Sequence, residues 1–253
     1  MTSTFLTIIL ATIIYLNFYR LLFILSPFQH SLHPLHTITP LQPDSPSVTK
    51  LISPHFASQL AHRVKNLSHK FQRVNHVLSV LGQAAYIHGP KKTYLHPHMN
   101  DLLWTHFSDL YQILLNYFKS RVPHDYSVQY RFALPGFHVF HCNTLFSLPV
   151  ASVHTDKQYR FLPFDCHEKK HLDFQNTLSF TLTLELPESG GGLYVLENFI
   201  PTKINYLPGY IVCHNGNHIH MITPSAPSRH RSRITLQGHG ILDTHKKIYW
   251  LYW

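Results

Sequence analysis

The sequence predicts a mostly β fold, a barrel or sandwich, with flanking helices. Three observations support this. After Pro123, about seven short apolar runs alternate with turn residues, which is typical of strands. The clearest run, LSFTLTLEL from Leu178 to Leu186, alternates apolar with Ser, Thr and Glu side chains, which predicts a half-buried strand. Before Pro123, apolar residues recur at helical spacing in two stretches.

The first predicted helix begins at Ser53 or Pro54, and the second follows Asn100. The apolar stripe of the first helix consists of Phe56, Leu60, Val64 and Leu67. That of the second consists of Leu103, Phe107, Leu110, Leu114 and Phe118. We expect both stripes to cover the β core. The predicted domain is 55–253, with helices over about 55–120 and a β core over about 126–240.

The N-terminal segment, residues 1–28, is almost entirely apolar, and fifteen residues from Phe5 to Tyr19 precede Arg20. A membrane-spanning helix needs about 20 apolar residues, and an arginine can reach the interface. The sequence therefore predicts a transmembrane anchor and membrane association; the alternative is a helix packed on the domain. Residues 29–54 are rich in Pro, Ser and His, which predicts a linker.

Composition limits the class of partner. Hydrophobic residues make up 44% of the chain and charged residues 13%, so a disordered protein is excluded. The net charge of +9 favours an acidic substrate or an anionic surface, but the chain has no pattern specific for nucleic acid. The three cysteines, Cys142, Cys166 and Cys213, form no Cys-x-x-Cys pair. A reducing compartment such as the cytoplasm is the simpler expectation.

Two His-x-Asp triplets occur, His154-Thr155-Asp156 and His171-Leu172-Asp173. With 23 His and eight Asp in 253 residues, chance predicts about 0.7 such triplets, so the triplet alone is no evidence for a metal site. In an extended chain, residues i and i+2 project to the same side and can reach one metal ion.

The order of the motifs is more informative. After SVHTD come the strand LSFTLTLEL, the segment ESGGGLYVLE, the segment PGYIVCHNGNHIHMITP, and RHRSRIT. Over residues 126–240, this order resembles the Fe(II)/2-oxoglutarate-dependent oxygenases. The resemblance implies a double-stranded β-helix, a jelly-roll or cupin-like core. It also implies one iron held by two histidines and a carboxylate, a set that leaves positions open for cosubstrate and O2.

By this resemblance the metal ligands are His154, Asp156 and His220. His171 and Asp173 are the alternative first pair. They fit the family pattern less well, since they lie only a few residues before the strand LSFTLTLEL. His220 precedes Pro224 by four residues, as the family pattern requires, and His218 is the alternative distal ligand or a pocket residue.

The resemblance also implies that Arg233 and Thr235 hold the far carboxylate of 2-oxoglutarate. A guanidinium suits this role, because it can bind a carboxylate with two parallel hydrogen bonds. Arg233 follows His220 by thirteen positions, further than in many members. Arg231 and Arg229 therefore remain alternatives.

The implied function is a dioxygenase that converts 2-oxoglutarate and O2 to succinate and CO2 and oxidises a C–H bond of its substrate. No catalytic nucleophile is expected. One alternative is a non-catalytic ligand-binding or scaffold protein on the same fold. A second is a cupin-like metalloenzyme that does not use 2-oxoglutarate, and a third is a membrane-associated structural protein. The sequence does not identify the substrate.

Overall fold

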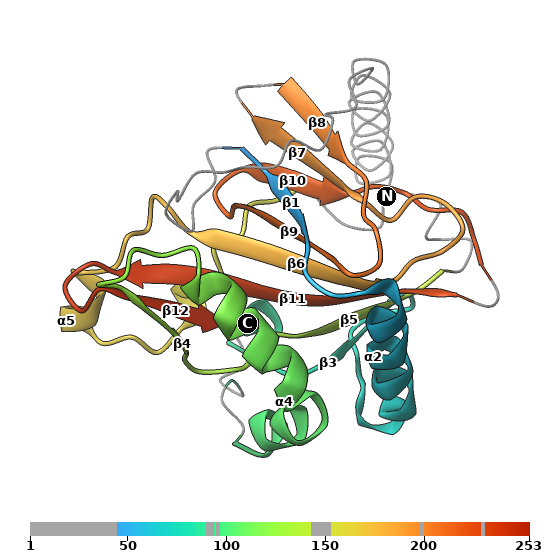
Figure 1. The fold of residues 1–253 in the computed structure, drawn as a ribbon, viewed down its shortest axis with the longest axis horizontal. Coiled ribbons are helices and arrows are strands. Elements are labelled where there is room, and N and C mark those ends of the chain that lie inside the picture. The colour runs from blue at the N-terminus through green and yellow to red at the C-terminus, as the bar shows by residue number, and fades with distance from the viewer. Residues whose placement is uncertain (1–44, 90–93, 95–96, 143–152, 198–199, 229–230) are drawn as a thin grey trace, which may run out of the picture.

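The computed structural model describes residues 45–89, 94, 97–142, 153–197, 200–228 and 231–253. In these segments a nine-stranded sheet and a three-stranded sheet form the core (Figure 1). The large sheet contains, in spatial order, β1 (Ser47–Lys50), β9 (Tyr210–Asn215), β6 (Leu178–Glu185), β11 (Ser232–Asp243), β5 (Gly136–His141), β3 (Leu78–Leu81) and β2 (Gln72–Arg73), with β12 (Ile248–Tyr252) beside β11 and β4 (Ser127–Tyr130) beside β12. The small sheet contains β10 (Ile219–Ile222), β7 (Leu193–Glu197) and β8 (Ile200–Ile204).

The strands within each sheet are antiparallel, except that β4 runs parallel to β12. The described helices are α2 (Pro54–Asn66), α3 (Ala85–His88), α4 (Pro97–Lys119) and α5 (Cys166–Lys169), with short 3-10 turns η1 (Ser68–Lys70) and η3 (Gln158–Phe161). The two facing sheets and the helices outside them confirm the predicted mostly β, jelly-roll-like fold with flanking helices.

Helices α2 and α4 cover one face of the large sheet (Figure 1). Their predicted stripes are buried: Leu60 and Val64 of α2 and all five stripe residues of α4 have no exposed surface. They pack against side chains of β6 and β11 such as Phe180 and Leu236. This apolar layer anchors the sheet that carries the site.

The opposite face of the large sheet is polar yet buried. Its side chains come from β5, β6, β9 and β11, and all are 7% exposed or less: His138, Ser179, Thr181, Thr183, His214, Arg233, Thr235 and His239. They alternate along the strands with the apolar residues that face the helices. The polar residues of β6 therefore do not face solvent, as the half-buried prediction assumed, but face the small sheet.

Two predicted boundaries differ from the structure. β1 lies inside the range 29–54 that was predicted as a linker, and it pairs with β9 at the edge of the large sheet. The strands also continue beyond residue 240, because β12 ends at Tyr252.

The prediction of a transmembrane helix and a membrane location is corrected. Residues 5 to 28 lie outside the described residues, and within the described part of the chain no helix is both long and apolar enough to cross a bilayer. The longest described helix, α4, has the length but carries Asp101, Asp109 and Lys119, which suits a helix with only one buried face.

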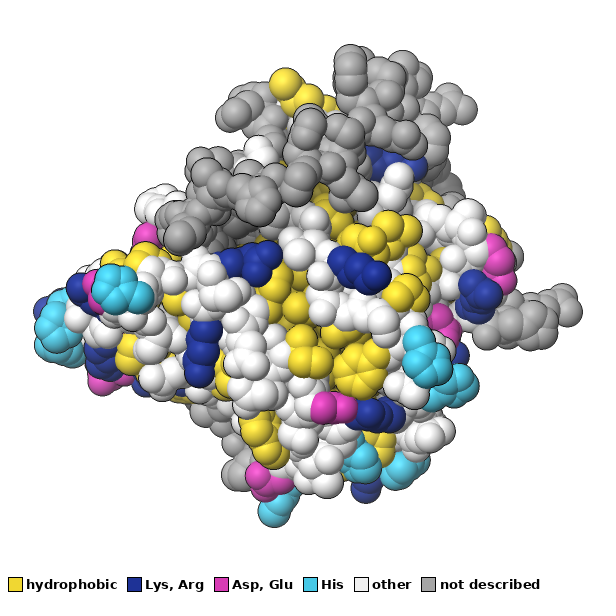
Figure 2. Space-filling view, in the orientation of Figure 1, with side chains coloured by type: hydrophobic (Ala, Val, Ile, Leu, Met, Phe, Trp, Pro, Cys, Tyr) yellow, Lys and Arg dark blue, Asp and Glu magenta, His cyan; other side chains and the backbone are white. Residues whose placement is uncertain are grey.

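Basic residues do not form one dominant patch on the face shown in Figure 2. There, the described Lys and Arg side chains are scattered among uncharged ones. Several are paired, for example Arg63 with Asp109 at 2.7 Å and Lys65 with Glu185 at 2.6 Å.

Candidate metal centre

The backbone brings His154 and His220 directly opposite one another. The two residues form an isolated antiparallel bridge, with N–H···O distances of 3.1 and 2.9 Å between their peptide groups. Directly opposed residues place their side chains on the same face. Asp156, two residues further along, projects to that face as well. The pairing of two strands, and not the His-x-Asp spacing alone, assembles the three side chains.

A close backbone approach holds Asp156 in place. Its N–H donates to the carbonyl of Gly216 at 2.7 Å. A Cβ at residue 216 would lie 2.9 Å from the hydroxyls of Ser179 and Thr177 and 3.3 Å from Cβ of Asp156. Glycine is therefore needed where the His-x-Asp segment passes the end of β9.

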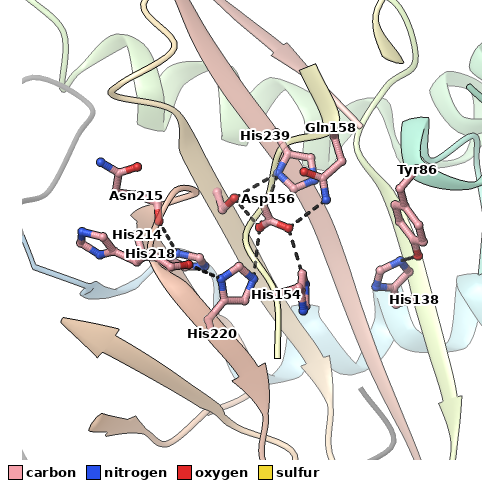
Figure 3. Close-up of polar contacts among 11 residues, drawn as sticks. Tyr86, His138, His154, Asp156, Gln158, His214, Asn215, His218, His220 and His239 are labelled. Atoms are coloured by element: carbon pink, nitrogen blue, oxygen red, sulfur yellow. Dashed lines mark hydrogen bonds and ion pairs between the residues drawn. The ribbon is translucent and has the colours of Figure 1, made fainter. Parts of the chain in front are cut away.

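The three predicted ligands form a cluster in which one ligand atom from each lies within 4.8 Å of the others. Nε2 of His220 is 3.3 Å from Oδ2 of Asp156, and Nε2 of His154 is 3.6 Å from Oδ1 (Figure 3). Bonds of about 2.1 Å at right angles to a divalent ion would put ligand atoms about 3 Å apart. The three ligand atoms, which lie within 4.8 Å of one another, would therefore draw closer together around a bound metal ion.

The cluster is open on one side. The side chains of Asp156 and His220 are each 4% exposed, whereas that of His154 is 40% exposed. An ion bound here would be reached by solvent or substrate past His154.

A hydrogen bond determines the tautomer of His220, which is the more buried of the two histidines in the cluster. Nδ1 of His220 contacts the carbonyl of His218 at 2.8 Å, and a carbonyl only accepts, so Nδ1 carries a proton. Nε2 is therefore the nitrogen that faces Asp156 and is available to a metal.

Electrostatics favour the ionised form of Asp156, which is the form that can bind a metal ion. Burial opposes its ionisation, but the neighbouring histidines, His220 first, hold its pKa well below the usual range. Burial likewise opposes protonation of His220, yet the Asp156 carboxylate raises the pKa of this imidazole. A divalent cation would replace the proton that His220 otherwise shares with Asp156.

Arg233 belongs to the buried polar face of the large sheet and is 2% exposed. Its Nε donates to the carbonyl of Gly191 at 2.8 Å, and its Nη1 lies 3.4 Å from Oγ1 of Thr235. The guanidinium carbon is 5.2 Å from the ring centre of Phe140 and 5.3 Å from that of Tyr206. Gly191 has a φ of +74°, which favours glycine at this close approach.

No carboxylate of the described residues pairs with Arg233. The ionisable groups that act most on its pKa are Tyr206 and Cys142. Burial raises the pKa of both, so neither carries a negative charge at neutral pH. Burial lowers the pKa of Arg233 itself, but an arginine stays charged. A buried cation without a paired anion is costly.

His138 lies on the same buried polar face of the large sheet. Burial lowers its pKa to about 3, and the charges acting on it include Arg233, Asp156 and His154. Its Nε2 lies 2.8 Å from the hydroxyl of Tyr86 (Figure 3). On the sheet, His138 is opposite Thr235. His138 and Thr235 are therefore neighbours on the buried polar face of the sheet that also carries Arg233.

The alternative residues lie elsewhere. His171 packs its ring against those of His167 and His245 near α5, with ring centres 5.2 and 4.9 Å apart. Asp173 accepts hydrogen bonds from the N–H groups of Gln175 and Asn176.

The remaining alternatives are His218, Arg231 and Arg229. His218 contributes its carbonyl to His220 and is not part of the three-ligand group. Arg231 is exposed, and Arg229 lies outside the described residues.

The structure adds residues that the sequence analysis did not select. Gln158 and Ser179 donate to the two oxygens of Asp156, and His239 contacts Ser179. Tyr206 places its ring centre 5.3 Å from the guanidinium carbon of Arg233. The sequence contained one indication of His239. It is separated from Arg233 and Thr235 by even numbers of residues in the same strand, so all three side chains lie on the same face of the sheet.

No protein-family model matches the sequence, and no curated protein matches it. Solved structures do. A prolyl hydroxylase from Trichoplax adhaerens, in complex with a hypoxia inducible factor peptide fragment, is 13% identical, with 83% of this chain and 89% of that chain covered and a TM-score of 0.49. An N-substituted L-amino acid dioxygenase from Burkholderia ambifaria AMMD, in complex with alpha-KG, is 12% identical, with 85% and 89% covered and a TM-score of 0.49. A Pseudomonas putida prolyl-4-hydroxylase is 11% identical, with 76% and 89% covered and a TM-score of 0.42.

The fold and the site define a class of protein: a double-stranded β-helix whose two sheets enclose a His/Asp/His cluster and a buried arginine. At these identities the functional argument rests on the geometry of the site itself.

Proposed function

We propose that the protein is an Fe(II)- and 2-oxoglutarate-dependent dioxygenase. One observation carries the proposal. The buried side chains between the two sheets include a His/Asp/His cluster and Arg233, a cation that no described carboxylate neutralises. A dicarboxylate that chelates a metal through one end and binds an arginine through the other would satisfy both.

The cluster suits iron(II) by its chemistry. Two imidazoles and one carboxylate on one face form the ligand set of non-haem Fe(II) oxygenases, with three positions left open. His154, Asp156 and His220 would hold the ion. When bound, iron(II) would support the oxidative decarboxylation of 2-oxoglutarate by O2 to succinate and CO2, coupled to oxidation of a substrate C–H bond.

The protein's own residues would position the reactants. Arg233 would bind the far carboxylate, with Thr235 and Tyr206 directing its guanidinium through the contacts described above. The buried side chains between the two sheets would exclude water. The partly exposed His154 marks the side from which a substrate would approach. The excess of basic residues favours an acidic substrate, whose identity stays open.

Other functions make different predictions. A cupin-like metalloenzyme without 2-oxoglutarate would bind the metal but leave Arg233 without a ligand. A non-catalytic member of the fold would bind metal and cosubstrate without forming succinate. A structural protein that binds metal incidentally would show no single stoichiometric site.

The test is anaerobic reconstitution with Fe(II) and 2-oxoglutarate, followed by exposure to O2 and assay of succinate. We expect one iron per chain in the wild type. His154→Ala, Asp156→Ala and His220→Ala should each abolish stoichiometric binding. His218→Ala and His171→Ala are matched controls in this histidine-rich chain and should keep their iron.

Iron retained by His220→Ala but lost by His218→Ala would move the distal ligand. Loss of iron in His171→Ala would replace the first pair. If the iron-loaded wild type binds no 2-oxoglutarate, the dioxygenase proposal is wrong.

A further inference from the structure

Both oxygens of Asp156 accept side-chain hydrogen bonds (Figure 3). Nε2 of Gln158 donates to Oδ1 at 2.8 Å, and the hydroxyl of Ser179 donates to Oδ2 at 2.6 Å. Behind Ser179, Nδ1 of His239 lies 3.0 Å from the hydroxyl oxygen. All three partners are 9% exposed or less. The carboxylate is therefore bound within the protein on two sides.

The direction of this chain of hydrogen bonds follows from its last member. An ionised carboxylate has no proton to give, so the single proton of the Ser179 hydroxyl points to Asp156. The hydroxyl oxygen then accepts, and Nδ1 of His239 must be the donor. This holds whether His239 is neutral or charged, because Nδ1 carries a proton in both cases. The order is His239 to Ser179 to Asp156.

We propose that His239 and Ser179 form a positioning relay that holds Asp156 as a single-oxygen metal ligand and so sets the affinity of the centre for its metal. The proposal rests on the proposed metal-binding function. Gln158 and Ser179 together stop the carboxylate from rotating about its terminal bond. A carboxylate fixed in this way can offer one lone pair to the ion without closing over a second position.

The relay extends across two strands that meet only in the folded sheet. Ser179 lies on β6 and His239 on β11, 60 residues apart. Partners of metal ligands typically contribute a factor of 10 to 100 in metal affinity, because they orient the ligand and raise its basicity. We therefore expect an effect on metal binding that exceeds the general cost of losing one hydrogen bond.

The chain contains a matched control. Ser79 on β3 and His141 on β5 form another serine–histidine contact, with Oγ 3.0 Å from Nε2. Ser79 is also buried, at 5% exposed, but neither residue contacts Asp156, His154 or His220 in any contact described above. Ser79→Ala removes a similar hydrogen bond from the same sheet without touching the relay.

The experiment titrates the full-length, metal-free protein with Co(II) under anaerobic conditions and follows the visible d–d absorbance, which requires no turnover. Ser179→Ala should bind Co(II) 10 to 100 times more weakly than the wild type. His239→Phe, which has no donor, should show a loss of similar size. His239→Asn, whose amide can donate from the position of Nδ1, should recover most of the affinity. Ser79→Ala should stay within about twofold of the wild type.

The double variant Ser179→Ala/His239→Phe should bind no more weakly than the weaker single variant, because both changes break one relay. Wild-type affinity in a folded Ser179→Ala protein, or equal affinities for His239→Asn and His239→Phe, would overturn the relay and leave the proposed function intact. Should Ser179→Ala not fold, the Asn and Phe variants of His239 carry the test. A wild type that binds no Co(II) or Fe(II) would overturn the metal centre and the relay with it.

Discussion

Arg233 combines full burial, an aromatic enclosure and the lack of a described carboxylate partner. Burying a guanidinium in this way costs several kcal/mol unless hydrogen bonds or an anion offset it. Gly191 and Thr235 use only part of its five donors. The remaining donors are where an incoming carboxylate would bind.

Removal of this guanidinium should separate cosubstrate binding from metal binding. Hydrogen bonds to charged groups contribute about 1.5–3 kcal/mol, so Arg233→Ala should weaken 2-oxoglutarate binding by about ten- to a hundredfold. Iron should stay bound, since Arg233 is not a ligand. Arg233→Lys should recover only part of the affinity, because an ammonium cannot form the two parallel bonds. The measurement is an anaerobic titration of the Fe(II)–2-oxoglutarate charge-transfer absorbance.

Arg231→Ala is the control for this prediction, because the exposed Arg231 precedes Arg233 by two residues. Its affinity for 2-oxoglutarate should match that of the wild type. If Arg231→Ala loses affinity and Arg233→Ala keeps it, the role belongs to Arg231.

At the level of elements, β6 shows why a strand pattern has two interpretations. Leu178, Phe180, Leu182 and Leu184 pack towards the helices, and Ser179 and its polar neighbours were expected to face water. They face the small sheet, and β6 is buried over nearly its whole length. Polar alternation in a strand therefore marks either a solvent face or an internal site, and only the position of the second sheet distinguishes them.

Helix α2 offers a test of how the helical layer is held on the sheet. Ser53 caps it: the Ser53 hydroxyl accepts from the N–H of Phe56 at 3.1 Å, and Pro54 begins the first turn. Ser53→Ala should lower the free energy of unfolding by about 1 kcal/mol, whereas Ser53→Asp should largely retain it. Chemical denaturation of both variants measures this. Equal destabilisation by Ala and Asp would show that the hydroxyl does not act as a cap.

At the level of the whole molecule, several histidines on the buried polar face of the large sheet are held neutral by burial. Burial lowers the pKa of His138 and of His214 to about 3, and it lowers that of His239 as well. Each must take up a proton on unfolding in mild acid. The folded protein should therefore be sensitive to acid in a range where most carboxylates are still ionised.

The sign for His138 follows from its lowered pKa. Its contribution to stability is fully present above the unfolded pKa of about 6.5 and is lost as the pH falls towards about 3. Between pH 7 and pH 5 the wild type should lose about 2 kcal/mol through this residue. His138→Gln removes the titration and keeps an acceptor for Tyr86, so its unfolding free energy should fall less over this range. Denaturant unfolding of the metal-free proteins at both pH values is the measurement. Parallel pH dependence of the two proteins would contradict the prediction.

The sequence by itself determined the mostly β class and the two apolar helix stripes, and it predicted His154, Asp156, His220, Arg233 and Thr235 as site residues. These follow from periodicities and motif orders that are local along the chain. The membrane prediction concerned residues 5 to 28, which lie outside the described residues, and no described helix is long and apolar enough to cross a bilayer. The tertiary structure alone decided which face of β6 is polar and internal, and that Ser179, Gln158 and His239 surround Asp156. It also decided that Arg233 lacks a described carboxylate partner. The physical reason is register: the partners lie up to 60 residues apart, and the pairing of β6, β9 and β11 sets which side chains meet.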